Sequence, residues 1–395
     1  MERSVNLSPD PSILDQFVVK VAGRCNIACR YCYMYELGDR TALDTPKFIT
    51  AEVIDAFALR LREHANATRL EQIVVALHGG EPLLIGHVRF RAIADKLREA
   101  IGDRLSLRLQ TNGLLVTQKW IDLFTEYRVV VGISLDGPHE INDLARVDHR
   151  GDGTYERTLA GLRLLIASQD ASNGFVFGGV ISVLNPRQSV VKYWEWLEEI
   201  NATHLGLLLP DADYENYAVH YPYKVEEFSQ FLCALFDCWW DSDSQINIRL
   251  FDNLVRKSIG GTSDSESIGS PGAPTVIIDT DGAIQAHDVM RINLGQPVFR
   301  ANVLVDPLVK ILEDPAYQQL NRSMFLGKEF RLPTACKQCP VRDLCGGGFV
   351  VHRFSLSSGY DNPSIYCAAL FSLATHAYLR VAVDAAASEN SSSLV

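Results

Sequence analysis

The chain lacks a long hydrophobic run and an excess of positive charge. No stretch of its 395 residues approaches the roughly 18 consecutive apolar residues of a membrane-spanning helix. Residues 1–10 contain no apolar core, so nothing there indicates a secretory signal peptide. The formal net charge is −11, whereas a protein whose main partner is nucleic acid needs a basic surface. We therefore expect a cytoplasmic protein that has neither a membrane nor a nucleic acid as its partner.

The rest of the composition is that of a globular enzyme. Hydrophobic residues make up 47% of the chain and charged residues 22%, which are ordinary values for a folded domain. A chain of this length holds one large domain and a smaller one. Nine cysteines without a secretory signal indicate a reducing compartment and metal ligation.

Three of the cysteines lie on one short segment near the start of the chain. Cys25, Cys29 and Cys32 have the spacing C-x3-C-x2-C. Three is an odd number for a disulfide framework, and no histidine follows at the spacing of a zinc finger. Three thiolates hold three irons of a [4Fe–4S] cube, whose usual complement is four cysteines. The fourth iron is then open to an outside ligand, so the spacing predicts a cluster that takes part in chemistry.

Short β-rich stretches alternate with helical patterns over the first 240 residues. Predicted strands cover 16–22, 72–77, 105–111, 129–135, 174–183 and 204–209. Predicted helices cover 50–64, 87–101, 117–127, 154–167, 189–200 and 225–240. The strands are largely apolar, as is typical of parallel strands covered on both faces. This alternation predicts an α/β fold, a partial (β/α)6 barrel of the TIM type that is two units short of closure.

The cysteine loop directly follows the first predicted strand, and other motifs follow later ones. Barrels of this type place reactive groups at the C-terminal ends of their strands. Gly79-Gly80-Glu81-Pro82 follows the second strand, where paired glycines let the backbone approach a ligand and present carbonyls to an ammonium group. Gln110-Thr111-Asn112-Gly113 follows the third strand. Each motif is also compatible with an ordinary turn.

Polar side chains at the end of the fourth predicted strand complete this set. Ser134 and Asp136 point to the same side of a strand and suit the hydroxyls of a ribose. Arg146 suits a carboxylate, which it can bind with two parallel hydrogen bonds. The alternative for Arg146 is a surface ion pair with one of the aspartates near it in the sequence.

Together, these motifs resemble those of radical S-adenosylmethionine (SAM) enzymes. The resemblance implies that SAM chelates the open iron through its amino and carboxylate groups. One electron from the reduced cluster cleaves SAM in that family to methionine and a 5′-deoxyadenosyl radical, which abstracts a hydrogen atom from the substrate. The residues that the resemblance assigns to SAM binding are Gly79, Gly80, Glu81, Asn112, Ser134, Asp136 and Arg146.

A second set of cysteines lies near the other end of the chain. Cys336, Cys339 and Cys345 have the spacing C-x2-C-x5-C, and Cys367 follows at a distance. Four cysteines suit either an iron–sulfur cluster or a structural zinc. The arrangement resembles the SPASM domain, the auxiliary-cluster domain of peptide-modifying radical SAM enzymes. The resemblance implies an auxiliary [4Fe–4S] cluster held by all four of these cysteines.

Two further cysteines of the SPASM pattern are replaced in this chain. His287 follows the expected strand and turn at 276–282, and Phe349 follows Cys345. Both missing ligands belong to another auxiliary cluster, so we predict only one. Asp288 matches the general base of anaerobic sulfatase maturases, which resemble this domain, and the resemblance implies that Asp288 takes a proton after hydrogen abstraction. A turn aspartate is the alternative.

The narrowest resemblance is to FxsB-type peptide maturases, which form cyclophanes. It rests on Tyr31-Cys32-Tyr33-Met34-Tyr35-Glu36, on Cys345-Gly346-Gly347-Gly348 and on Asn362-Pro363-Ser364-Ile365-Tyr366-Cys367. It implies abstraction of a Cβ hydrogen from a ribosomally made precursor peptide and a link from that carbon to an aromatic ring. The implied partners are this peptide and an external electron donor of the flavodoxin or ferredoxin type. Because 15 residues precede the first predicted strand, we expect the leader peptide to bind the barrel, the C-terminal domain or a separate leader-binding protein.

Three other functions stay open at this point. The chain could be a formylglycine-forming sulfatase maturase, a thioether-forming peptide maturase, or a non-catalytic iron–sulfur or zinc scaffold. The predicted organisation is an N-terminal tail at 1–15, a radical SAM partial barrel at 16–241, and a bridging segment and linker at 242–272. A SPASM-like auxiliary domain with a C-terminal helix follows at 273–384, and a flexible tail at 385–395.

Overall fold

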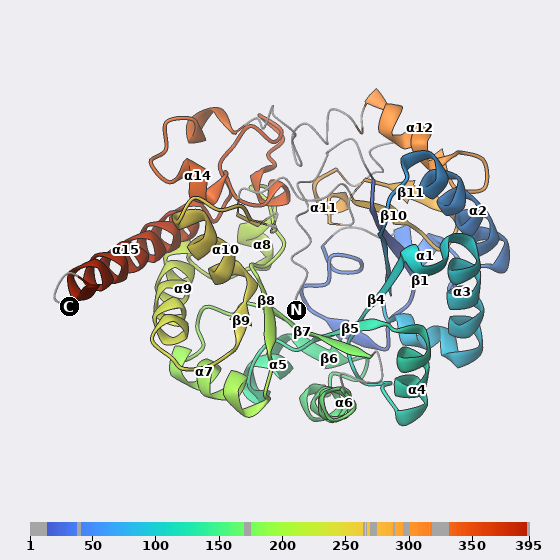
Figure 1. The fold of residues 1–395 in the computed structure, drawn as a ribbon, viewed down its shortest axis with the longest axis horizontal. Helices are drawn as coiled ribbons and strands as arrows, with labels where there is room; N and C mark the ends of the chain where they lie inside the picture. Colours follow the sequence, from blue (N-terminus) through green and yellow to red (C-terminus); the bar gives the residue numbers. More distant parts are fainter. Residues whose placement is uncertain are drawn as a thin grey trace.

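A curved, mostly parallel sheet runs through the described part of the protein (Figure 1). The structure is a computed structural model that describes residues 14–37, 41–169, 175–263, 265, 267–268, 275–286, 289–294, 301–315, 317 and 332–392. Six of the parallel strands follow one another in chain order: β1 (Gln16–Ala22), β3 (Ile73–Gly79), β4 (Leu105–Thr111), β5 (Val130–Ser134), β7 (Val176–Val183) and β8 (His204–Leu208). These strands confirm the predicted partial barrel.

Long helices connect these strands and cover the outside of the sheet (Figure 1). They are α2 (Ala51–Thr68), α3 (Gly86–Ile101), α4 (Gln118–Tyr127), α6 (Tyr155–Ala167), α7 (Val190–Glu199) and α9 (Val225–Trp240). Helix α2 begins where a hydroxyl can cap it, because the backbone N–H of Val53 donates to Thr50 Oγ1 at 3.3 Å. Apolar side chains such as Phe57, Phe90 and Phe124 are fully buried between helices and sheet. This burial holds the helices against the strands.

The C-terminal half of the chain extends the same sheet at both edges. Strand β9 (Asn247–Ile248) pairs with β8, and β10 (Thr275–Ile278) pairs in parallel with β1. Strands β11 (Ala283–Gln285) and β12 (Ala301–Asn302) add antiparallel pairs beyond β10. Over the described residues the sheet does not close on itself, because β12 and β9 are its two edges.

Buried ion pairs fasten β10 to the first strand. Lys20 Nζ on β1 lies 3.5 Å from Asp279 Oδ1, which follows β10. Arg291, in α11 (Arg291–Leu294), also contacts the Asp279 carboxylate. All three side chains are buried, so the loss of one of these charges leaves another uncompensated in the interior.

A separate two-stranded sheet supports the cysteine loop. Strands β2 (Ile27–Cys29) and β6 (Arg146–Asp148) are antiparallel, and Cys29 is the register partner of Arg146. This pair was not predicted, because strands of three residues carry no periodic signal in the sequence. The pairing brings a predicted cluster ligand and a predicted SAM-binding residue together.

Helix α15 (Cys367–Ser392) packs along α9 and α10 (Arg249–Ser258). Its His376 and Arg380 side chains both contact Asp237 Oδ1 of α9, at 2.7 and 3.0 Å. The helix continues through residues 385–392, which we expected to form a tail. Among the described residues, no helix combines the length and the apolar character that a membrane span requires.

Shorter elements complete the fold. They are α1 (Thr41–Asp44), η1 (Pro82–Ile85), η2 (Gly102–Arg104), α5 (His139–Ala145), α8 (Tyr217–His220), α12 (Leu308–Glu313), η3 (Thr334–Cys336), α14 (Arg342–Cys345) and η4 (Val350–Arg353). Elements η3 and α14 end at Cys336 and Cys345 of the second cysteine set. The predicted domain boundaries stay a prediction.

Candidate active site

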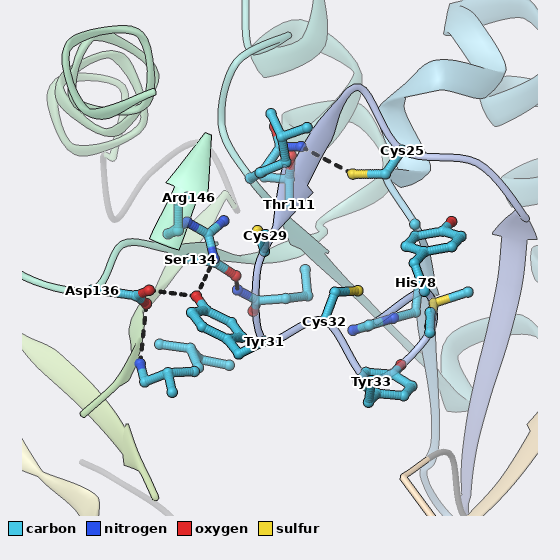
Figure 2. A pocket seen from close by; sticks show the side chains of 18 of the residues that line it. Cys25, Cys29, Tyr31, Cys32, Tyr33, His78, Thr111, Ser134, Asp136 and Arg146 are labelled. Atoms are coloured by element: carbon cyan, nitrogen blue, oxygen red, sulfur yellow. Dashed lines mark hydrogen bonds between the residues drawn. The ribbon is translucent and has the colours of Figure 1, made fainter. Parts of the chain in front are cut away.

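The C-terminal ends of the parallel strands surround a cavity of about 230 Å³ (Figure 2). All three cysteines of the N-terminal set line this cavity. Six of the seven predicted SAM-binding residues line it as well, namely Gly79, Gly80, Asn112, Ser134, Asp136 and Arg146. Residues from distant parts of the sequence therefore meet at the edge of the sheet where such folds place their chemistry.

Hydrogen bonds to neighbouring segments fix the cysteine loop. Arg30 N–H donates to Ala145 O at 3.0 Å, and the His149 ring nitrogen Nε2 lies 2.9 Å from Cys25 O. Asn112 Nδ2 donates to Asn26 Oδ1 at 2.7 Å and lies 3.8 Å from Cys25 Sγ. The loop that carries the thiols is thus held from β6 on one side and from the end of β4 on the other.

Gly79 and Gly80 let the loop after β3 press against the cysteine loop. A Cβ atom at Gly80 would lie 2.4 Å from both Arg24 O and Tyr35 OH. Gly79 has φ +140°, and a Cβ atom there would lie 2.1 Å from Ala22 O. Gly80 N–H also donates to Ala22 O at 2.8 Å. Close backbone approach explains both glycines before any ligand is considered.

Glu81 lies beneath the cavity and does not line it. Its buried carboxylate accepts hydrogen bonds from Leu83 N–H at 3.0 Å, Thr111 Oγ1 at 2.7 Å and Asn112 N–H at 2.8 Å. Burial raises the pKa of Glu81, while these hydrogen bonds oppose that shift. The structure therefore gives Glu81 a supporting position, in which it fixes the end of β4 and the backbone of Asn112.

Arg146, Tyr31 and Asp136 form a chain of hydrogen bonds across the cavity wall (Figure 2). Arg146 Nη1 donates to Tyr31 OH at 2.9 Å, and Tyr31 OH donates to Asp136 Oδ2. Asp136 Oδ1 accepts from Val183 N–H at 3.1 Å. Within the described part of the chain, Arg146 Nε is buried without a hydrogen-bond partner. A buried donor of this kind is suited to an anionic group of a ligand.

The thiols of the N-terminal set fit a metal cluster. All nine cysteines of the chain are free. Burial raises the pKa of Cys25 and of Cys32 to about 12, so both thiols are neutral unless a cation replaces their protons. Among the described residues, no three His, Cys, Asp or Glu side chains are grouped as a single metal ion needs. A four-iron cube does not need its ligands grouped so closely, because each cysteine binds a different iron.

The second cysteine set gathers around a smaller cavity of about 20 Å³. Cys336, Cys339, Cys345 and Cys367 all line it. Burial raises the pKa of Cys345 to about 12. Cys336 ends η3, Cys339 lies in the following turn, Cys345 ends α14 and Cys367 begins α15. Folding therefore brings together cysteines that lie up to 31 positions apart (336 to 367). This donor set fits a fully ligated cluster.

Two residues that the sequence singled out are not placed in the site by the structure. Asp288 and His287 lie outside the described residues. Phe349, which occupies the other replaced cysteine position, packs its ring against His352 with a centroid distance of 5.2 Å. The role of Asp288 stays a prediction.

Several other residues that line the cavity were not predicted from the sequence. Tyr31 belongs to the cysteine motif, and an aromatic residue beside a cysteine was its only signal. His78 lies at the end of β3, directly before the paired glycines. Asp211 follows β8 and also lines the cavity, but a lone aspartate after a strand carries no motif.

Comparisons with known proteins agree with this arrangement. Residues 19–181 match the family model of the Radical SAM superfamily. The cysteine-type anaerobic sulfatase-maturating enzyme of Clostridium perfringens (strain 13 / Type A) is 24% identical over 363 residues, which cover 90% of this chain and 93% of that one. The serine-type enzyme of Bacteroides thetaiotaomicron is 23% identical over 89% of this chain and 86% of that one.

Solved structures share the fold. Native anSMEcpe with bound AdoMet superposes with a TM-score of 0.78 at 23% identity, over 94% of this chain and 99% of that chain. Streptococcus suis SuiB bound to the precursor peptide SuiA gives a TM-score of 0.60 at 15% identity, over 90% and 76% of the chains. The protein therefore has the α/β fold of the radical SAM superfamily, and residues 19–181 carry the sequence pattern of that superfamily.

Proposed function

We propose that the protein is a radical SAM maturase that oxidises one residue of a peptide or protein substrate. The observation that carries this proposal is the cavity in which Cys25, Cys29 and Cys32 meet Ser134 and Arg146. Similarity to sulfatase-maturating enzymes over about nine-tenths of both chains supports a cysteine or serine as the modified residue and formylglycine as the product.

The chain's own residues would serve this reaction by holding the cofactors. Cys25, Cys29 and Cys32 would hold the cluster, and SAM bound at its open iron supplies a 5′-deoxyadenosyl radical after one-electron reduction. Arg146 would bind the SAM carboxylate with its inward-facing guanidinium, and Ser134 and Asp136 would receive the ribose. Cys336, Cys339, Cys345 and Cys367 would hold an auxiliary cluster that suits electron transfer, because all of its irons have protein ligands.

The substrate chemistry is a two-electron oxidation. The substrate first loses a hydrogen atom from Cβ and then one electron and the proton of its thiol or hydroxyl group. A serine becomes the aldehyde directly. A cysteine becomes a thioaldehyde, which reacts with water to give the same aldehyde and hydrogen sulfide.

Cyclophane formation is a second candidate. It is favoured by the glycines after Cys345 and by the stretch Asn362-Pro363-Ser364-Ile365-Tyr366-Cys367. It is also favoured by the replacement of two expected cysteines by His287 and Phe349. In that reaction the Cβ radical adds to an aromatic ring, and the ring then loses an electron and a proton. A thioether-forming reaction would begin with the same abstraction.

The test uses anaerobically reconstituted, reduced enzyme with SAM. The first substrate is the Cp18Cys peptide, which one anSMEcpe structure contains together with AdoMet. We expect 5′-deoxyadenosine and a peptide aldehyde that reacts with a hydrazide. A small peptide encoded beside the gene is the second substrate, and a loss of two hydrogens without an aldehyde would favour the cyclophane.

Two results define the outcome of this test. The Cys29→Ala variant should release no 5′-deoxyadenosine, because the cluster loses a ligand. If the wild-type enzyme also releases none from SAM, the protein is a scaffold and the proposal is wrong.

A further inference from the structure

One side-chain amide joins the end of β4 to the cysteine loop. Asn112 directly follows β4 and lines the cavity, and its side chain is buried. Its Nδ2 group donates to Asn26 Oδ1 at 2.7 Å and, more weakly, to Cys25 Sγ at 3.8 Å. The amide therefore faces the sulfur of a predicted cluster ligand as well as the loop that carries it.

The orientation of this amide follows from the partner of its oxygen. Leu114 N–H donates to Asn112 Oδ1 at 3.1 Å, so the oxygen faces the turn after β4. The NH2 group then points the opposite way, toward Asn26 and Cys25. With the two ends exchanged, the amide would set oxygen against Asn26 Oδ1 and NH2 against the Leu114 N–H, so that like groups would face each other. The hydrogen-bond pattern thus assigns the donor to the side of the thiol.

The backbone of Asn112 is also fixed on both sides. Its N–H donates to Glu81 Oε2 at 2.8 Å, and its carbonyl accepts from Thr158 Oγ1 at 3.0 Å. Glu81 and Thr158 are both buried. Gly113 has φ +83°, and a Cβ atom there would lie 2.5 Å from Ile133 Cδ1. These contacts preorganise the amide, so its direction is set by the fold.

The contacts of Asn112 bear on its expected role in SAM binding. The resemblance to radical SAM enzymes assigns Asn112 to SAM, but both acceptors of its NH2 group lie on the cysteine loop. Its oxygen already accepts the Leu114 N–H. The position therefore favours the cysteine loop over SAM as the partner of this NH2 group.

A hydrogen bond to a ligating sulfur changes the reduction potential of an iron–sulfur cluster. The added electron makes the cluster more negative, and an N–H dipole that faces a sulfur stabilises this charge. The effect is stronger in a buried site, where water does not screen it. In the proposed function, reduction of the N-terminal cluster is the first step of the reaction. A donor beside Cys25 would act on that step.

Resting on the proposed function, we infer that Asn112 is a positioning residue of the N-terminal cluster, and that its NH2 group raises the reduction potential through the Cys25 sulfur. An external donor of the flavodoxin or ferredoxin class gives up one electron, and the [4Fe–4S] cube passes from the 2+ to the 1+ state. No bond forms or breaks in this step. By easing it, Asn112 lets a weaker reductant start the reaction.

The test measures the reduction potential of this cluster in the full-length, anaerobically reconstituted chain. The reduced cube is followed by electron paramagnetic resonance during a redox titration without SAM, and the signal that Cys29→Ala lacks belongs to the N-terminal cluster. Asn112→Leu keeps the branched shape of the side chain but has no donor. We expect its reduction equilibrium constant to fall about tenfold, which is about 59 mV toward lower potential for one electron.

Asn26→Ala is the matched control. It removes the stronger contact of Asn112 with the cysteine loop but keeps the donor that faces Cys25. We expect this variant to keep the wild-type potential. Asn112→Asp is a second test variant, because it retains the acceptor for Leu114 N–H and places an oxygen where the NH2 group was. We expect its potential to fall at least as far as that of Asn112→Leu.

Two results would overturn the inference about Asn112. One is a wild-type potential in Asn112→Asp or in Asn112→Leu. The other is an equal fall in Asn26→Ala, which would show that Asn112 acts only by holding the loop. A wild-type chain that lacks the signal of the N-terminal cluster is a different outcome, because it contradicts the proposed function itself and with it the basis of the inference.

Discussion

Gly80 lies where the loop after β3 touches the cysteine loop, and it leaves no room for a side chain. A methyl group there would meet Arg24 O and Tyr35 OH at 2.4 Å. We expect Gly80→Ala to displace the cysteine loop and to lower bound iron from about eight to about four per chain. Gly206→Ala is the control, because a Cβ atom in β8 would meet its nearest neighbour at 3.4 Å, an ordinary contact. Iron analysis of the two purified variants checks this, and full iron content in Gly80→Ala would contradict it.

Glu81 shows how one buried carboxylate supports the site from below. Replacing it with glutamine keeps the shape but turns one acceptor oxygen into an NH2 group that faces an N–H or O–H donor. We expect Glu81→Gln to lower the free energy of unfolding by about 2 kcal/mol, since a buried donor loses its partner. Glu63→Gln removes an exposed carboxylate from a surface pair with Arg60 and should change stability by less than about 0.5 kcal/mol. Urea unfolding of both variants measures the difference, and equal effects would refute the prediction.

At the scale of elements, the strands whose bounds depend on the local sequence pattern were predictable. Strands β1 and β4 have the predicted bounds, because each is a seven-residue stretch flanked by turn residues. The pairing of β10 with β1 and the β2–β6 sheet were not predictable, since partners far apart in sequence set them. The sites divide in the same way. The cysteines follow from their spacing, whereas the approach of His352 Nε2 to 3.9 Å from Asp211 Oδ1 depends on how the C-terminal part folds back.

Asn293 is the residue on which this folding back can be tested. Its buried side chain donates to Asp213 Oδ2 at 2.7 Å and to Val351 O at 3.3 Å, so it joins α11, the loop after β8 and η4. Asn293→Ala leaves the buried Asp213 carboxylate without this donor, and we expect a loss of about 2–3 kcal/mol in unfolding free energy. We also expect faster hydrogen exchange in the segment that contains Asp211.

The control for Asn293 is Gln245→Ala. Gln245 donates one weak hydrogen bond, to Asp243 O at 3.4 Å, from an exposed position. Its loss should change stability by less than about 0.5 kcal/mol. If Asn293→Ala behaves like this control, the C-terminal part does not depend on Asn293 for its attachment.

At the scale of the whole molecule, elements from the C-terminal part of the chain pack against both sides of the barrel. Strand β10 extends the sheet beside β1, while α15 lies along α9 on the other side of the sheet (Figure 1). We therefore expect two separate effects. A fall in pH should lower the stability of the fold, whereas the loss of a cysteine ligand should lower the iron content.

The pH dependence of stability follows from His352. Burial lowers its pKa from 6.5 to about 3 in the folded protein, so unfolding takes up a proton at pH values between about 3 and 6.5. Stability is therefore lost as the pH falls, and between pH 7 and pH 5 the loss from this residue is about 2 kcal/mol at 1.36 kcal/mol per pKa unit. His352→Phe should remove this part of the slope. Burial also lowers the pKa of His64, so a smaller slope remains.

Urea unfolding at several pH values measures this slope. His204→Gln is the control, because His204 is exposed at the start of β8. We expect this variant to keep the wild-type slope. An unchanged slope in His352→Phe would show that His352 does not resist protonation.

Iron content tests whether the two cysteine sets act as separate sites. They line different cavities, so the loss of one set should leave the other intact. We expect about eight irons in the wild-type chain, about four in Cys29→Ala and about four in Cys336→Ala. Cys233→Ala should keep all eight, because Cys233 lies on α9 and lines neither cavity. About four irons together with one zinc in the wild-type chain would instead identify the C-terminal set as a structural zinc site, since four cysteines suit that ion equally well.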